Sequence, residues 1–512
     1  MSEDQRDVIA FLKNPSSYCP EVDRVEVIET HASLVFIAGE RAFKLKRAVA
    51  YPYLDFSTAD LRRRACEAEL VLNRRTAPAL YEEVRGLFRG ADGAVSFSPN
   101  GEALDWVVVM RRFDQTLLFD ALAKTGGLDR QVMDQLADHI AQFHASAERH
   151  FDHGGAAEMA DLAEVQYRCL AAPRDAGFCP DQVHGIVEKW HGQLAAAAEL
   201  LDRRRAVGKV RHCHGDLHLR NICFVDGKPT LFDCLEFDEA LACIDVLYDL
   251  AFLLMDLENS GLGHLANRVF NRYLDRSEED DGLAAMPFFL SLRAAIRAHV
   301  TATTLERATS PVAKVEMAAD ARCYLQLAHR FLEPHPCRLV AIGGVSGTGK
   351  STLAAGVAPE FGIRPGARIL RSDVTRKLLW GVSPETRLPA SAYTREISQR
   401  VYDGLCRTAA KCLTAGYSVI IDAVALLPEE RASFAEVALA ASIPFLGLWL
   451  EGSAEAMADR IRGRTRDASD ASPEIVAEQL RHDPGKIDWV RIDAGARPQD
   501  CLAAARRALA AS

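Results

Sequence analysis

Residues 211–250 read RHCHGDLHLRNICFVDGKPTLFDCLEFDEALACIDVLYDL, and this stretch decides the fold of most of the chain. It contains His214-Gly215-Asp216, then Asn221 five residues after the aspartate, and then Asp233 at the end of a short apolar run. Asp226-Gly227 lies between two apolar runs, which is a typical two-residue β-hairpin signal. Because Asn221 and Asp233 stand at opposite ends of its two arms, we expect the hairpin to bring them beside each other.

The spacing of these oxygen-bearing side chains fits phosphoryl transfer from ATP. A hydroxyl that attacks the γ-phosphate needs a carboxylate to orient it and take its proton, and Mg²⁺ needs oxygen ligands that bridge it to the phosphates. Asp216 suits the first role, and Asn221 and Asp233 suit the second. A plain turn capped by Asp216 does not explain the other two residues.

A zinc cluster is the other reading of the same stretch, because imidazole and thiolate are good Zn²⁺ ligands. His212, Cys213, His214 and His218 are four such donors within seven residues. Four donors packed so closely do not easily surround one ion, so phosphoryl transfer is the better hypothesis.

The stretch resembles the catalytic loop and metal-binding segment of the aminoglycoside phosphotransferase and choline kinase group, relatives of the protein kinases. Asp245–Ala251 (DVLYDLA) also resembles that group's DxxYDLA segment, which opens the following helix. The resemblance implies a bilobal kinase-like fold, with ATP and Mg²⁺ bound between a sheet-rich lobe and a helical lobe.

Before this stretch, residues 25–29, 33–38 and 41–46 read as three strands. In a kinase-like lobe, one strand lysine reaches the phosphates and is held by a helix glutamate. Lys44 and Lys46 lie two apart and share a face, so both remain candidates, with Lys44 favoured. On the expected helix 61–73 the resemblance favours Glu69 over Glu67 as the partner. A solvated helix face is the alternative for these charges.

The strands before Lys44 lack the GxGxxG motif of protein kinases, as aminoglycoside-type enzymes also do. Trp106–Met110 is an apolar run that suits the last strand before the inter-lobe hinge, where backbone groups around Met110 would hold the adenine. Helical spacing over 117–124 and 131–148 predicts the helical lobe, and 291–306 closes it. Arg293 and Arg297 on that last helix either serve a substrate or pair with acids in the core.

A second nucleotide-binding pattern follows Glu333-Pro334-His335-Pro336, a proline-containing stretch that ends the preceding helix. The apolar run 337–342 leads directly into GGVSGTGKST, residues 343–352, and then into a helical sequence. This fits the GxxxxGK[ST] phosphate-binding loop in its required strand–loop–helix context, where backbone N–H groups and the helix N-terminus hold phosphates. The residues that we expect to bind nucleotide here are Gly344, Gly347, Gly349, Lys350, Ser351 and Thr352.

The rest of the second half alternates strands and helices, which predicts a parallel α/β sheet. Asp422 ends the apolar run 417–421 and is a plausible Mg²⁺-shell aspartate, together with the Ser351 hydroxyl. A further expected strand, 444–450, precedes four arginines, which read either as a lid that clamps the transferring phosphate or as a solvated basic helix. These four are Arg460, Arg462, Arg464 and Arg466, and Arg464 is the one assigned to catalysis.

Residues 337–512 resemble the small P-loop kinases grouped with gluconate kinase, most closely in GVSGTGKST. Where gluconate kinase would carry a DGDxxHP-like segment, this chain has RSDVTR, residues 371–376, which argues against gluconate as the substrate. The segment is equally similar to that of zeta toxin and chloramphenicol phosphotransferase, in which an aspartate after the second strand activates the acceptor hydroxyl. That resemblance implies the same role for Asp373.

Composition limits the class of protein. With 512 residues, 49% hydrophobic and 26% charged, the chain fits a globular protein of two or three domains. A formal charge of −10 argues against nucleic acid as the main partner. The thirteen cysteines form no CxxC pair, the N-terminus is polar, and no stretch reaches the roughly 18 apolar residues of a membrane span. We therefore expect a cytoplasmic protein with no membrane partner.

Together these patterns predict an α+β bilobal protein-kinase-like domain followed by an α/β P-loop NTPase domain with a doubly wound parallel sheet. The expected boundaries are 1–110 for the sheet-rich lobe, 111–332 for the helical lobe and 337–512 for the P-loop domain. The predicted function is ATP-dependent phosphoryl transfer to hydroxyls of small molecules at two sites. The alternative is one active kinase domain regulated by ATP binding at the other, nearly inactive one.

Overall fold

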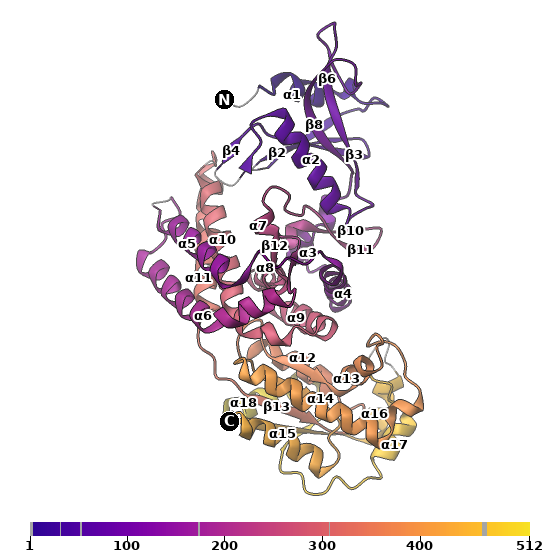
Figure 1. Cartoon of the computed structure of the whole chain (residues 1–512). Coiled ribbons are helices and arrows are strands. Elements are labelled where there is room, and N and C mark those ends of the chain that lie inside the picture. The colour runs from indigo at the N-terminus through magenta and orange to yellow at the C-terminus, as the bar shows by residue number, and fades with distance from the viewer. Residues whose placement is uncertain are drawn as a thin grey trace. The chain divides into compact units, whose positions relative to one another are not determined.

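We describe a computed structural model over residues 4–30, 32–51, 54–172, 175–306, 308–462 and 468–511. The chain divides into two compact units, coloured by residue number in Figure 1. The first unit contains residues 1–260 and 292–326, and the second contains residues 261–291 and 327–512.

The amino-terminal part of the first unit is a six-stranded antiparallel sheet in the order β1-β2-β3-β8-β6-β7. Its three expected strands are confirmed with the expected bounds. Its strands are β1 (Val25–Glu29), β2 (Ser33–Ala38), β3 (Arg41–Lys46), β6 (Tyr81–Arg89), β7 (Val95–Ser96) and β8 (Glu102–Arg111), beside the small pair β4 (Ala50–Tyr51) and β5 (Leu54–Asp55).

Strand β8 shows why this sheet has a helix on each face. Alternate side chains of a strand point to opposite faces, so Val107 and Val109 join the core built with Val8 and Leu12 of α1 (Arg6–Lys13). Val108 and Met110 join the opposite core, built with Cys66 of α2 (Ala59–Asn73). Helix α2 thereby carries Glu69 to the face where Lys44 and Lys46 point.

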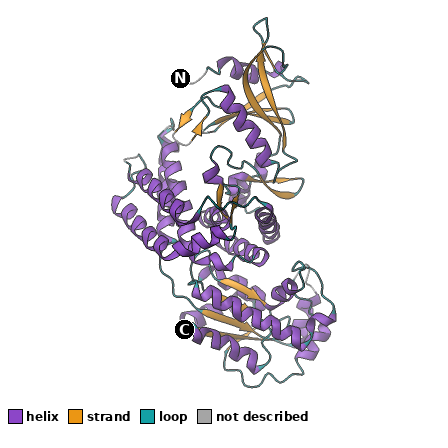
Figure 2. Cartoon of the chain, viewed as in Figure 1, coloured by secondary structure: helices purple, strands orange, loops and turns teal. Residues whose placement is uncertain are grey.

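The rest of the first unit is mostly helical, as Figure 2 shows. The hairpin expected at Asp226-Gly227 is confirmed, with both residues at positive φ (50° and 75°). The elements are η1 (Pro15–Ser17), η2 (Gln115–Leu117), α3 (Phe119–Thr125), α4 (Arg130–Ser146), α5 (Gly155–Ala171), α6 (Pro180–Ala206), β9 (Val210–His212), η3 (Leu219–Asn221), β10 (Ile222–Val225), β11 (Lys228–Leu231), α7 (Glu239–Ala242), β12 (Cys243–Asp245) and α8 (Val246–Asn259).

The second unit contains the expected parallel sheet, five strands in the order β14-β15-β13-β16-β17. Strands β13 and β15 are buried throughout, which explains their unbroken apolar sequences. The elements are β13 (Leu339–Gly343), α12 (Lys350–Val357), η5 (Ala358–Glu360), β14 (Arg368–Arg371), α13 (Ser372–Leu379), η6 (Ala390–Tyr393), α14 (Arg395–Thr414), β15 (Val419–Asp422), α15 (Pro428–Ala440), β16 (Phe445–Glu451), α16 (Ala454–Arg462), α17 (Pro473–Gln479), β17 (Val490–Asp493) and α18 (Pro498–Ala511).

The division into units differs from the expected domain boundaries at residues 261–291, which include α9 (Gly263–Ser277) and η4 (Asp280–Ala285). We expected this segment in the helical lobe, but it packs in the second unit along the edge strand β14. The Asn271 side chain accepts from the N–H of Ile369 (2.7 Å) and donates to the carbonyl of Ala367 (3.2 Å). The segment thus covers an otherwise open sheet edge.

Helices α10 (Met286–Leu305) and α11 (Pro311–Arg330) contribute residues to both units. The helical stretch Asp280–Leu305 is long and apolar enough by composition to cross a membrane, with a mean hydropathy of 1.2 over 18 residues. However, 72% of that window is buried within the protein, which is typical of a core helix.

Candidate active sites

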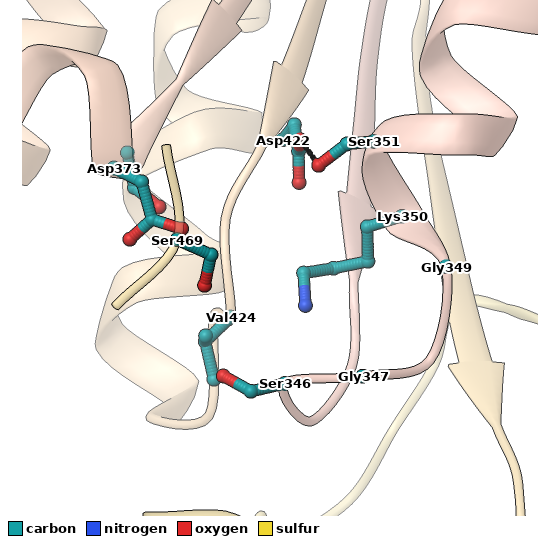
Figure 3. Close-up of a pocket in the computed structure, with 10 residues that line it drawn as sticks. Ser346, Gly347, Gly349, Lys350, Ser351, Asp373, Asp422, Val424 and Ser469 are labelled. Carbon is teal, nitrogen blue, oxygen red and sulfur yellow. Dashed lines mark hydrogen bonds between the residues drawn. The ribbon is translucent and has the colours of Figure 1, made fainter. Parts of the chain in front are cut away.

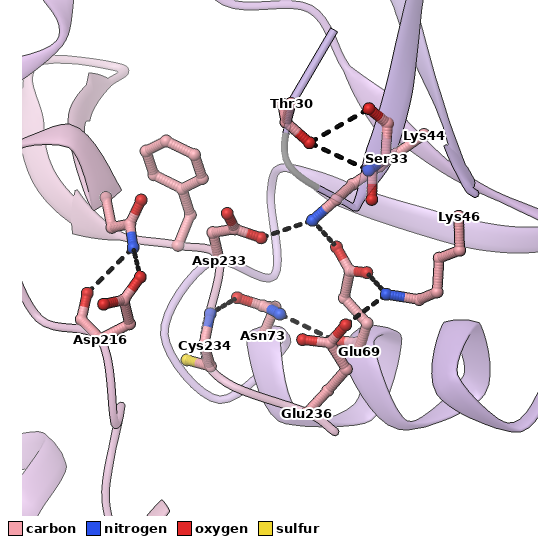
Figure 4. A network of polar contacts seen from close by, with 12 residues as sticks. Thr30, Ser33, Lys44, Lys46, Glu69, Asn73, Asp216, Asp233, Cys234 and Glu236 are labelled. Carbon is pink, nitrogen blue, oxygen red and sulfur yellow. Dashed lines mark hydrogen bonds and ion pairs between the residues drawn. The ribbon is translucent and has the colours of Figure 1, made fainter. Parts of the chain in front are cut away.

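The first candidate site is built around two lysines of β3 that share one glutamate of α2 (Figure 4). Lys44 Nζ lies 2.8 Å from Glu69 Oε1 and 2.5 Å from Asp233 Oδ1, while Lys46 Nζ lies 2.7 Å from Glu69 Oε2 and also contacts Glu236. The Lys46 side chain is 1% exposed and the Lys44 side chain 13%, so Lys44 is the one with an open side. This geometry favours Lys44 as the phosphate-binding lysine.

Glu69 is fully buried between the two ammonium groups. Burial opposes its ionisation, but Lys44 and Lys46 hold its pKa down at about 2. Glu67, the other candidate on α2, pairs with Arg63 at 2.9 Å and is half exposed. The solvated-face reading therefore fits Glu67 and not Glu69.

Asp233 is held in a strained position beside Lys44. Its φ is +61°, a left-handed conformation that costs a non-glycine residue of order 1–3 kcal/mol and is concentrated at functional sites. The Asp233 N–H donates to Tyr81 Oη (3.2 Å), and the next N–H, of Cys234, donates to Asn73 Oδ1 (2.8 Å). These contacts leave the carboxylate 40% exposed and turned toward Lys44.

Asp216 and Asn221 meet in the loop that the sequence indicated. Asn221 Nδ2 donates to both the carbonyl and Oδ2 of Asp216, at 2.9 Å each. The carbonyl of Asn221 accepts from the N–H of Phe232 (3.0 Å), so the hairpin brings Asn221 next to the residue before Asp233. Burial opposes ionisation of Asp216, but His218, 3.3 Å from Oδ2, and the more distant Arg297 hold its pKa below the usual range.

A buried aspartate of α8 fixes the shape of this loop. Asp249 accepts from the N–H groups of His214 (3.1 Å) and Gly215 (2.9 Å), and lies 3.0 Å from His144 Nε2. Arg293 donates to the carbonyls of Gly215 (3.2 Å) and Tyr248 (3.1 Å). Arg293 thus supports the loop that contains Asp216. From the sequence we expected this arginine either to serve a substrate or to pair with acids in the core, and neither expectation included this role.

Met110 is the penultimate residue of β8 and is paired with Ala42 on one side and Tyr81 on the other. The next two N–H groups, of Arg111 and Arg112, donate to the carbonyls of Leu80 and Glu40 (2.8 Å each). The role of the Met110 backbone in holding adenine stays a prediction.

The second candidate site is the loop between β13 and α12, which lines a hollow of ≈ 340 Å³, part of it open to solvent (Figure 3). Gly344, Gly347 and Gly349 all have positive φ, and a Cβ on Gly344 would lie 2.5 Å from the carbonyl of Leu450. Lys350 Nζ donates to the carbonyls of Gly344 (2.8 Å) and Val345 (3.2 Å). The loop therefore curls around its own lysine, as a phosphate cradle requires.

Ser351 and Asp422, the two expected Mg²⁺ residues, are in direct contact. Ser351 Oγ donates to Asp422 Oδ2 at 2.6 Å. Arg371, at the end of β14, donates to the same Ser351 oxygen (3.2 Å) and lies 3.5 Å from Asp422. All three stand where parallel strands end, the edge at which such sheets bind ligands.

Asp373 lines the same hollow, together with Ser372 and Ser469. Burial raises the pKa of its carboxyl, Arg371 lowers it and Asp422 raises it, with a net shift above the usual range. Beside it, Asp470 accepts from Lys377 (2.6 Å), Tyr393 (2.5 Å) and the N–H of Leu388 (3.0 Å). No sequence pattern indicated a role for Asp470, because its partners come from distant parts of the chain.

The expected arginine lid is described only in part. Arg460 donates to the carbonyls of Thr348 (3.4 Å) and Ala494 (2.5 Å), and Arg462 pairs with Asp459 (2.6 Å) at the surface. Arg464 and Arg466 lie outside the described residues. Thr352 is exposed on α12 and is not among the residues that line the hollow.

Three more residues of the sites were missed at the sequence level. Glu236 pairs with Lys46. Its position three residues after Asp233, as a second carboxylate after the hairpin, was a signal in the sequence that could have indicated it. His218 was considered only as a metal ligand, although it lies beside Asp216. Gln479 of α17 accepts from the N–H of Ser346 in the phosphate-binding loop (2.9 Å), a contact that only the fold reveals.

Comparison with known proteins finds a family match in each half of the chain. Residues 98–289 match the model of the phosphotransferase enzyme family, and residues 339–483 match the model described as AAA domain. Among solved structures, a gluconokinase from Sinorhizobium meliloti 1021 is 21% identical, covering 35% of this chain and 94% of its own, with a TM-score of 0.26. A choline/ethanolamine kinase family protein from Mesorhizobium loti is 14% identical, covering 63% and 98%, with a TM-score of 0.38.

The two matched regions define a fusion of a protein-kinase-like phosphotransferase domain with a P-loop kinase-type domain. The uncharacterized protein Rv2004c of Mycobacterium tuberculosis (strain ATCC 25618 / H37Rv) is 32% identical over 472 residues, which is 91% of each chain. The chain belongs to the family of this protein.

Proposed function

We propose that the protein transfers the γ-phosphate of ATP to hydroxyl groups of small molecules, and that both sites are catalytic. The observation that carries the proposal is the first site, where Lys44 bridges Glu69 and Asp233 while Asp216 and Asn221 are joined one hairpin away. Phosphoryl transfer needs a phosphate-binding cation, metal-binding oxygens and a carboxylate for the acceptor proton. These five residues supply all three.

In the first site we assign each group a role from its contacts. Lys44 is the cation for the phosphates, and Glu69 holds it in place. The exposed carboxylate of Asp233 and the amide oxygen of Asn221 are oxygen donors of the type that Mg²⁺ takes. Asp216 orients the acceptor hydroxyl and receives its proton, and its ionised form is favoured by His218.

In the second site the backbone of residues 344–349 and Lys350 suit nucleotide phosphates, and Ser351 with Asp422 suits Mg²⁺. Asp373 lies across the hollow from the loop, as Figure 3 shows, and we assign it to the acceptor hydroxyl. The acceptor would lie near Asp470, which accepts hydrogen bonds from Lys377 of α13, from the N–H of Leu388 and from Tyr393. None of the thirteen cysteines forms a disulfide, which fits a reducing cytoplasm as the location.

The test is transfer of labelled phosphate from ATP into a fractionated metabolite extract by wild type, Asp216→Asn and Asp226→Asn. We expect Asp216→Asn to lower formation of at least one product by about 10²–10⁴-fold, the usual contribution of a general base. Asp226 pairs with Arg111 at the surface of the hairpin, so Asp226→Asn is the matched control and should match wild type. A full set of products at wild-type rates from Asp216→Asn would refute the role of the first site.

A further inference from the structure

A second group of chemically active side chains lies in the first unit, at the base of the catalytic loop. Strands β9 and β12 pair antiparallel with His212 opposite Cys243. The segment 148–150 pairs with the other edge of β9. Arg149 forms an isolated antiparallel β-bridge with Arg211, and the N–H of His150 donates to the carbonyl of Val210 (3.0 Å). Residues directly opposite each other on paired strands share a face, and so do residues two apart on one strand. His150 is opposite Val210, two residues before His212, so His150, His212 and Cys243 all point to the same side.

The three side chains converge. One ligand atom from each of His150, His212 and Cys243 lies within 4.8 Å of the other two. A tetrahedral Zn²⁺ with bonds of about 2.0–2.3 Å needs ligand atoms roughly 3.5 Å apart, so small side-chain rotations would close the shell. Asp152 and His153 form an overlapping group with His150 within the same limit.

One polar atom of this cluster is left open for a ligand. The His150 side chain is 14% exposed, and its Nε2 is buried and makes no hydrogen bond within the described part of the chain. A buried nitrogen without a partner destabilises the folded state, and a bound ion would supply the missing partner. The Cys243 side chain is fully buried beside it.

We propose that His150, His212 and Cys243 bind a transition-metal ion, with Zn²⁺ as the best fit and the fourth position filled by Asp152, His153 or water. A His₂Cys donor set excludes Mg²⁺ and Ca²⁺, which take oxygen ligands. The ion has a structural role. It ties three chain segments together two residues before His214, where the catalytic loop begins.

The experiment uses the full-length protein, stripped of metal with a chelator and titrated with Zn²⁺ and with Co²⁺. We expect one ion per chain at this site, a thiolate-to-Co²⁺ charge-transfer band, and a higher melting temperature when Zn²⁺ is bound. Cys243→Ser should abolish the band. His150→Gln, at a partly exposed position, should weaken Zn²⁺ binding by at least about 10-fold, since even outer-shell changes cost that much.

Cys323→Ser and His184→Gln are the controls, because both residues are exposed on helices away from the cluster. Both variants should bind Zn²⁺ and Co²⁺ as wild type does. Wild-type protein that binds no Zn²⁺, or that binds it with the same affinity and band as folded His150→Gln, would overturn the proposal. So would loss of the band in Cys323→Ser with its retention in Cys243→Ser.

Discussion

At the scale of single residues, the first site depends on one buried glutamate that serves two lysines. Lys44 and Lys46 point to the same face because they are two apart on a strand, and Glu69 is the carboxylate between them. The two lysines are not equivalent, since Lys46 is locked between Glu69 and Glu236 while Lys44 reaches Asp233. We therefore propose Lys44 as the phosphate-binding lysine and Lys46 as the lysine that holds the network together.

Glu69→Gln should weaken both stability and ATP use. Removing one partner of a buried ion pair leaves the other charges uncompensated and costs about 3–5 kcal/mol. We expect a lower melting temperature for the first unit and a raised KM for ATP at the first site. Glu67→Gln, on the same helix but half exposed, should change neither quantity. Equal behaviour of the two variants in calorimetry and kinetics would contradict the assignment.

If Asp216 and Asp373 are the general bases, as we propose, the two sites should give different pH profiles. Protonation inactivates a general base, so activity is lost as pH falls through its pKa. The pKa of Asp216 is held low by His218 and Arg297 despite burial, whereas burial raises the pKa of Asp373. The variant Asp216→Asn leaves only the second site active, and Lys350→Ala leaves only the first. As the pH is lowered, Asp216→Asn should therefore lose product formation at a higher pH than Lys350→Ala does. The reverse order would contradict both assignments.

At the scale of elements, the sequence was informative wherever a motif was local. The hairpin at Asp226-Gly227, the three strands around Lys44 and the loop that ends in Lys350 all follow from nearby residues with defined backbone preferences. Asp249 and Arg293 could not be given their roles from sequence. They act on the catalytic loop through contacts that span 34 and 78 residues, and only tertiary packing creates these.

The loop that contains Asp216 also depends on Gly215, because its backbone conformation suits glycine. Gly215 has φ +81°, and a Cβ there would lie 2.9 Å from the Cβ of Leu235. Gly215→Ala should shift the loop, lower first-site activity by at least about 10-fold, in line with small misplacements near chemistry, and leave second-site products unchanged.

Gly192→Ala is the matched control for this substitution. Gly192 lies within α6, and a Cβ there meets no atom within 4 Å. Replacing a helical glycine with alanine should stabilise the protein by about 0.5–1 kcal/mol and leave both activities unchanged. If Gly215→Ala kept full first-site activity, the loop geometry would not be essential.

At the scale of the whole molecule, the feature that the sequence did not predict is the membership of residues 261–291 in the second unit. The phosphotransferase match runs to residue 289, so the family boundary and the compact unit differ here. The reason lies in Arg368, whose buried guanidinium lies 2.7 Å from both Asp275 and Asp280. A local sequence pattern shows neither this pairing nor the asparagine contacts along β14.

Arg368→Met should strongly destabilise the second unit, because Asp275 and Asp280 would remain buried without their cation, a cost of about 3–5 kcal/mol. We expect a lower melting temperature and faster proteolysis of the second unit in the full-length protein. Arg506→Met removes an exposed pair with Glu360 and should leave the melting temperature unchanged. An unchanged Arg368→Met would show that the segment 261–291 is not held by these charges.

We propose that one chain carries two independent phosphoryl-transfer sites. The most direct measurement compares the labelled products formed from ATP and a metabolite extract by wild type, Asp216→Asn, Lys350→Ala and the double variant. We predict that each single variant loses a different subset of products and that the double variant makes none. If Lys350→Ala abolished every product while Asp216→Asn lost none, the claim of two catalytic sites would be wrong.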